Sequence, residues 1–177
     1  MKSKLITISA VSAGLIAVLL SIGTYFEFAD VFTVVLASVF VLLPLYYNSY
    51  KGGLLAYLGG GVLAFIISGF NFYSIVYPAF LGFFGVYPLV LCYMRDKRVN
   101  QALRYLIGAI WCIAVFFGIY YYYTALIGDF FMGLPQWVAD YAELVILPVA
   151  IVFYFAFDRF IILVSRVLNY YLSRIIK

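Results

Sequence analysis

Small residues recur at every fourth position through the stretch 51–69, and this spacing constrains the fold more than any other feature of the sequence. The series consists of Gly52, Ala56, Gly60, Ala64 and Ser68. Residues four apart lie on one face of an α-helix, so they form a ridge without bulky side chains. In a membrane, such a ridge lets a second helix approach closely, because packing replaces the missing hydrophobic drive. We interpret the stretch as the central helix of a small polytopic membrane protein; the alternative is a generic packing stripe without a functional message.

The composition supports a membrane-embedded chain. Of the 177 residues, 68% are hydrophobic, 21% are aromatic and only 10% are charged, and the mean hydropathy is +1.13. A soluble domain of this size cannot bury so much apolar surface. At about 20 residues per span, the chain has room for five or six helices and for no separate globular domain. The sequence therefore predicts an all-α, polytopic integral membrane protein in which residues 1–177 form a single transmembrane domain.

Successive apolar stretches predict six transmembrane helices. Their expected bounds are 5–24, 31–50, 52–69, 75–94, 103–126 and 144–163, followed by an amphipathic tail over 160–177. The first stretch could instead be a cleaved signal peptide, but its own ridge of small residues favours a retained span. The fourth has Gly82, Gly85 and Pro88 near its middle, which predicts a bent helix with a cavity beside it. The tail is predicted either to anchor the chain at the membrane interface or to dock a partner.

The charged residues predict the orientation in the membrane. With the N-terminus in the cytoplasm and six spans, all 11 Lys and Arg residues fall at cytoplasmic ends, as the positive-inside rule requires. The acidic residues Glu27, Asp30, Asp129, Asp140 and Glu143 fall on the outer side. We therefore expect both termini inside, in a multi-pass protein of the cell membrane with lipid as a partner. Nucleic acid is not an expected partner, because the basic residues lie at span ends rather than in one patch.

The sequence lacks side chains that membrane enzymes commonly use. It contains no histidine, which removes the commonest general base and the usual metal ligand. Cys92 and Cys112 fall in apolar helices and are expected to pack as small hydrophobes. Asp158 is expected near the inner surface, where an ion pair with Arg159 or interfacial solvation accounts for it. We therefore predict no enzyme activity, no metal and no other cofactor, and we do not expect an ion-coupled transporter.

Aromatic and acidic residues gather on the predicted outer side. The candidate substrate-binding residues are Asn71, Tyr77, Tyr121, Asp129, Trp137 and Glu143. Aromatic rings provide flat apolar walls, while carboxylates and an amide orient a ligand, so the set suits a small planar molecule that is aromatic or cationic. The alternative interpretation is an ordinary belt of Tyr and Trp at the membrane interface.

Several of these features together resemble one known family. They are the short spans, the small residues Ala13 and Ala17 on the first helix, and the turn over 50–56, in which Lys51 precedes two glycines. In these respects the chain resembles the substrate-binding S component of an energy-coupling factor (ECF) transporter. The resemblance implies a bacterial protein that binds a vitamin or a metal on the outer side. It also implies a transmembrane T component, which Ala13 and Ala17 would face, and two cytoplasmic ATPases. The lack of histidine argues against a nickel or cobalt member.

The predicted function is that of a membrane-embedded substrate-binding subunit for uptake of a small, vitamin-like solute. Ala13, Ala17 and Gly60 are the candidate partner-docking residues. The alternative is a non-transport scaffold or accessory subunit whose ridges pack other helices in a complex. A third candidate is a lipid-handling protein that uses the bent fourth span as a groove.

Overall fold

The computed structural model describes residues 2–47, 49–127 and 141–175, which form helices joined by short turns. In chain order the elements are α1 (Lys2–Tyr25), η1 (Glu27–Ala29), α2 (Asp30–Tyr46), α3 (Tyr50–Ile67), α4 (Val76–Ala79), η2 (Phe80–Phe84), α5 (Val86–Asp96), α6 (Gln101–Ile127) and α8 (Ala142–Ile175). η1 is a 3-10 turn, whereas η2 is a π-helical segment. These residues contain no β-strand, which confirms the predicted all-α class.

Among the described residues, five helical stretches are long and apolar enough to cross a membrane, as a multi-pass membrane protein requires. They are Ser3–Tyr25, Tyr50–Ile67, Val76–Asp96, Gln101–Leu126 and Leu144–Tyr171. The second predicted span corresponds to α2, which is apolar but shorter, with 17 residues. The predicted sixth span and the predicted amphipathic tail form one helix, α8, with Pro148 inside it.

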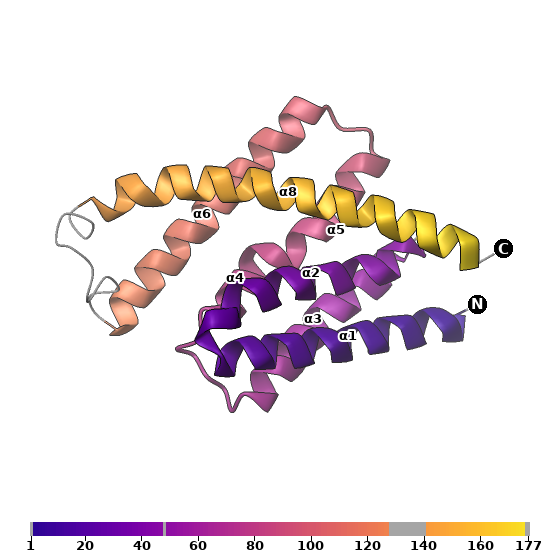
Figure 1. Cartoon of the computed structure of the whole chain (residues 1–177), viewed down its shortest axis with the longest axis horizontal. Coiled ribbons are helices and arrows are strands. Elements are labelled where there is room, and N and C mark those ends of the chain that lie inside the picture. Colours follow the sequence, from indigo (N-terminus) through magenta and orange to yellow (C-terminus); the bar gives the residue numbers. More distant parts are fainter. Residues whose placement is uncertain (1, 48, 128–140, 176–177) are drawn as a thin grey trace.

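The helices form two groups (Figure 1). α1, α2 and α3 pack against one another, and α6 crosses α8 as a pair, with the segment α4–η2–α5 between the two groups. α2 links the groups, because it also contacts α5 and α8. The N- and C-terminal ends lie together at one end of the bundle, which we call the terminal end. The opposite end is called the distal end.

The ridge of small residues forms the contact between α3 and α1. Its buried members are Gly52, Ala56, Gly60, Ala64 and Ser68. A Cβ atom at Gly60 would lie 2.5 Å from Cγ2 of Ile16 and 3.1 Å from the backbone oxygen of Ala13. Because the two helices approach this closely, no larger residue fits at Gly60 without displacing α1. The structure thus confirms the prediction of a tightly packed helix.

The fourth predicted span is irregular at its centre, as its glycine and proline content predicts. The segment Phe80–Phe84 is π-helical rather than α-helical, and side chains of neighbouring helices bond its carbonyl groups. The Tyr57 hydroxyl donates to the Leu81 carbonyl oxygen at 2.7 Å, and the Trp111 indole N–H donates to that of Gly82 at 2.9 Å. Since a bilayer supplies no water to an irregular helix, such side-chain partners stabilise it.

Aromatic rings fill the contact between the fourth span and α8. Phe83, Phe84 and Tyr87 each contact Phe157, with ring centroids 4.9 to 5.7 Å apart. Tyr154 packs against Tyr87 with centroids 5.8 Å apart. All of these side chains are buried. We call this set the aromatic core.

Candidate functional site

A cavity of about 450 Å³ lies between α2, α4, α6 and α8 near the distal end of the bundle, and we call it the distal cavity. Its lining includes Asp30 and Val34 of α2, Ala79 and Phe84 of the fourth span, Phe116 and Tyr120 of α6, and Val145, Val149 and Phe153 of α8. Among the lining residues, only Asp30 and Tyr120 carry a polar side-chain group. The walls of the cavity are therefore almost wholly apolar, with one acidic and one phenolic residue among those that line it.

Phenylalanine rings join the walls of the distal cavity. Phe153 of α8 contacts Phe84 of the fourth span with centroids 5.5 Å apart, and it contacts Phe116 of α6 at 5.7 Å. The rings thereby link three separate helices, while the small side chain of Ala79 leaves space beside them. The arrangement agrees with the prediction of a cavity beside the bent fourth span.

The predicted binding residue Tyr77 is part of the internal packing. Its side chain is buried, and its hydroxyl lies 2.9 Å from Oγ1 of Thr24 and 3.2 Å from the carbonyl oxygen of Ala64. The Tyr77 hydroxyl also donates to Ser68. This network ties α1, the end of α3 and α4 together, and Tyr77 does not line the distal cavity.

Asn71 and Tyr121 are not brought together around the distal cavity either. The Asn71 side-chain oxygen accepts a hydrogen bond from the backbone N–H of Tyr73 at 3.0 Å, within the turn that follows α3. Tyr121 is 54% exposed on α6 and is stacked on Phe117 with centroids 6.3 Å apart. Neither Asn71 nor Tyr121 lines the distal cavity.

The remaining predicted binding residues fall in or next to the segment 128–140. Asp129 and Trp137 lie outside the described residues, and of Glu143 only the backbone, in the first turn of α8, is described. Their role in substrate binding stays a prediction. On either side of this segment, Tyr120 and Val145 line the distal cavity.

The predicted partner-docking residues lie inside the chain. Ala13 and Ala17 are 8% and 2% exposed, and Gly60 packs against α1 at Ile16. Their small size is therefore already explained by the contact between α1 and α3. A role in docking a partner helix would require these two helices to separate.

The prediction that interfacial solvation accounts for Asp158 is wrong. Its side chain is wholly buried in the aromatic core, where the Tyr87 hydroxyl donates to Oδ1 at 2.5 Å. Oδ2 is buried and has no hydrogen-bond partner among the described residues. The reason is the orientation of α8, because Asp158 lies one turn after Tyr154, on the face that packs inward. A buried carboxylate in a membrane helix is costly and marks a candidate functional residue.

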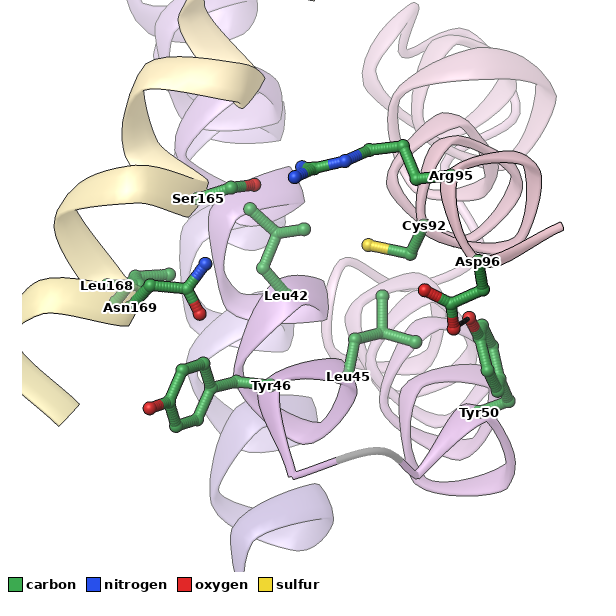
Figure 2. Close-up of a pocket in the computed structure, with 10 residues that line it drawn as sticks. All are labelled: Leu42, Leu45, Tyr46, Tyr50, Cys92, Arg95, Asp96, Ser165, Leu168 and Asn169. Atoms are coloured by element: carbon green, nitrogen blue, oxygen red, sulfur yellow. Dashed lines mark hydrogen bonds between the residues drawn. The ribbon is translucent and has the colours of Figure 1, made fainter. Parts of the chain in front are cut away.

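A second, more polar cavity of about 180 Å³ lies near the terminal end, between α2, the start of α3, α5 and α8 (Figure 2). The Tyr50 hydroxyl donates to the Asp96 carboxylate on one side of it. The Arg95 side chain extends from α5 toward Ser165 on α8, whose hydroxyl oxygen is buried without a hydrogen-bond partner in the described part of the chain. Polar groups of three helices therefore converge at this end.

Sequence reasoning missed most of the residues that line the distal cavity. The sequence places Asp30 on the outer side but assigns it to no site, and it gives no reason to single out Phe116 or Phe153. The only available signal was the irregular composition of the fourth span, because the facing residues come from helices distant in sequence. Within the described residues, no group of three His, Cys, Asp or Glu side chains is placed to hold a metal ion.

Comparison of the chain with protein-family models, with curated proteins and with solved structures gives no match.

Proposed function

We propose that the chain is the substrate-binding subunit of an uptake system and that it binds a small aromatic or cationic solute in the distal cavity. The observation that carries this proposal is the cavity itself. Its volume of about 450 Å³ falls in the range typical of small-molecule sites, roughly 300–1,000 Å³. Apolar walls with a few polar groups are also typical of such sites.

The lining chemistry favours a cation with an apolar or aromatic body. Asp30 is the one charged residue among those that line the cavity, and no Lys or Arg is among them. Phe84, Phe116 and Phe153 provide ring faces and edges for packing. The ring of Tyr120 adds a π-face that a cation is attracted to. An anionic solute would meet a like charge from Asp30 and no basic side chain.

The proposed orientation places the terminal end in the cytoplasm and the distal cavity on the outer side of the cell membrane. α2 is proposed as a sixth span, since it packs alongside α1 and α3 and its 17 residues extend about 25 Å as an α-helix. The positive-inside rule supports this orientation.

Cysteine labelling tests the orientation. In a background with Cys92 and Cys112 replaced by alanine, Lys97→Cys should react with a membrane-impermeant maleimide only from the cytoplasmic side. Tyr73 is exposed in the turn between α3 and α4, and this turn lies at the distal end (Figure 1), so Tyr73→Cys should react only from outside. Labelling of Lys97→Cys from outside intact cells would contradict the proposed orientation.

The proposed partners follow from the resemblance to S components. On this proposal the chain has no ATPase of its own, and a transmembrane T component with two cytoplasmic ATPases would power transport. The scaffold alternative relies on the ridges of small residues for partner contacts, and those ridges are occupied between α1 and α3. The cavity therefore favours the proposal of a substrate-binding subunit over the alternative of a scaffold.

Calorimetry with two probe molecules tests the site. Benzylammonium and the neutral benzyl alcohol differ mainly in charge, so Asp30→Asn should weaken binding of the cation by about 1–3 kcal/mol and leave the alcohol nearly unchanged. Asp96→Asn, which removes a carboxylate at the other end, is the matched control. Ala79→Phe should abolish binding of both probes by filling the cavity.

Substitution of two neighbouring tyrosines tests whether the ligand binds in the distal cavity or in the outer cluster predicted from sequence. Tyr120 lines the cavity, whereas Tyr121 does not. Tyr120→Leu should weaken benzylammonium binding by about 1–2 kcal/mol, and Tyr121→Leu should leave it unchanged. The opposite order of effects would favour the outer cluster over the cavity.

A second candidate function is lipid handling, because the cavity walls are almost wholly apolar. An acyl chain would fill such a space without using Asp30. Mass spectrometry of the protein after gentle solubilisation distinguishes the two functions: a retained lipid that is lost in Ala79→Phe and unaffected by Asp30→Asn favours lipid handling.

A further inference from the structure

A third cavity, of about 220 Å³, is surrounded by arginine side chains. It lies between the end of α5, the start of α6 and the second half of α8. Its lining residues are Arg95, Gln101, Arg104, Tyr105, Arg159, Ile162 and Arg166. On α6 and on α8 these residues are spaced three or four apart, so each helix turns one face toward the cavity. We call it the arginine pocket.

The arginine pocket has no acidic lining residue to balance its charge. The two carboxylates adjacent to its arginines in sequence have partners elsewhere, since Asp96 accepts from Tyr50 and Asp158 accepts from Tyr87. Like charges around so small a volume repel one another. An anion between them would remove that repulsion and gain attraction from each guanidinium.

Arg104 provides the most specific indication of a missing partner. Its Nε is buried and has no hydrogen-bond partner among the described residues. The guanidinium lies 5.2 Å from the centroid of the Tyr105 ring, which holds its plane in place. A buried N–H donor without an acceptor is unfavourable, and an anionic oxygen is the acceptor that would satisfy it best.

We propose that the arginine pocket binds the phosphate group of an anionic ligand. The planar guanidinium forms paired N–H donors that match two oxygens of a phosphate. Tyr105 adds a further donor: its oxygen already accepts from the Gln101 amide at 2.9 Å, so its own proton is available to a ligand. Such a set of donors from three helices suits a tetrahedral, multiply charged oxyanion.

A phospholipid headgroup is the source of phosphate that this position favours. Arg95, Arg159 and Arg166 are exposed at the mouth, whereas Arg104 and Tyr105 are half-buried. The adjacent surface is apolar, with Leu106 and Leu163 59% and 60% exposed, as acyl chains require. Basic pockets between membrane helices on the cytoplasmic side are typical headgroup sites.

Native mass spectrometry and a thermal-shift assay test the proposal on the full chain in neutral detergent. The probes are phosphatidylglycerol, zwitterionic phosphatidylcholine and inorganic phosphate. Phosphatidylglycerol should be retained and should raise the melting temperature, and Arg104→Gln should lower its affinity about tenfold or more, which corresponds to one charge-assisted hydrogen bond. Arg104→Lys keeps the positive charge but loses the paired N–H donors of the guanidinium, so its affinity for phosphatidylglycerol should be intermediate.

Arg98→Gln is the matched control, because Arg98 is exposed at the same end but does not line the pocket. It should bind phosphatidylglycerol as the unchanged protein does. The melting temperature of each unliganded variant shows whether Arg104→Gln is folded; if it is not, Arg166→Gln, at the exposed mouth, serves in its place. Saturable binding of inorganic phosphate, with the same dependence on Arg104, would support the site with free phosphate as its ligand. Equal affinities of Arg98→Gln, Arg104→Gln and Arg166→Gln for phosphatidylglycerol and for inorganic phosphate would overturn the proposal.

Discussion

The contact between α1 and α3 and the contacts of α8 are built from opposite kinds of residue. Small residues bring α1 and α3 together until Gly60 meets Ile16, whereas aromatic rings join α8 to the fourth span and α6. All three cavities described above are lined by α8, with Val149, Ser165 and Arg166 in one each. Glycine and alanine allow close contact along a helix, while rings fill some positions and leave gaps at others. The comparison indicates that the small-residue half is closely packed and that the cavities, with the two proposed binding sites among them, belong to the α8 half.

The largest expected loss of stability comes from a substitution that breaks the contact of small residues between α1 and α3. Gly60→Leu should destabilise the protein by about 3 kcal/mol, because the side chain must displace Ile16 or the α1 backbone. Unfolding in mixed detergent micelles, followed by circular dichroism, measures the change. Gly14→Leu is the matched control, since nothing lies within 4 Å of a Cβ at Gly14. Equal stabilities of the two variants would show that α1 and α3 are less closely packed than described.

A smaller effect is expected in the aromatic core. Tyr87→Phe removes the hydrogen bond to Asp158 and leaves that carboxylate buried, which should cost about 2 kcal/mol. Adding Asp158→Leu to Tyr87→Phe should restore part of the loss, because the unpartnered buried group is then gone. Tyr93→Phe, at a 55% exposed site, is the control. If Tyr87→Phe matches that control in the same unfolding assay, the Asp158 bond does not stabilise the core.

The smallest effects concern the π-helical segment, which lies between the two regions. Tyr57→Phe and Trp111→Phe each remove one donor to its carbonyl groups, and each should cost about 1 kcal/mol. Amide hydrogen exchange should become faster within 80–84 and should stay unchanged in α1. Tyr73→Phe, on an exposed side chain in the distal turn, is expected to change neither measurement.

The sequence was sufficient to predict the close contact of the glycine ridge and the irregular fourth span, because both are expressed in local spacing. The sequence was not sufficient to predict the burial of Asp158. The adjacent Arg159 suggests an ion pair, and only the packing of α8 decides which of the two side chains faces inward. The periodic positions Tyr154 and Ile161 on the same face held part of that information. The distal cavity depends on how α6 crosses α8, and no local pattern encodes that angle.

Pro148 is a point in α8 at which the helix bends more easily, and it divides α8 into a short and a long part. Proline has no N–H to bond the carbonyl four residues earlier, so the helix bends more easily there than elsewhere. On one side of Pro148 is a short arm that carries Val145 and Ile146 against the distal cavity. On the other side is a long arm that Tyr154 and Phe157 fix in the aromatic core. A change of the helix bend at Pro148 would therefore move the part of the cavity wall that Val145 and Ile146 form, and it would leave Tyr154 and Phe157 in place.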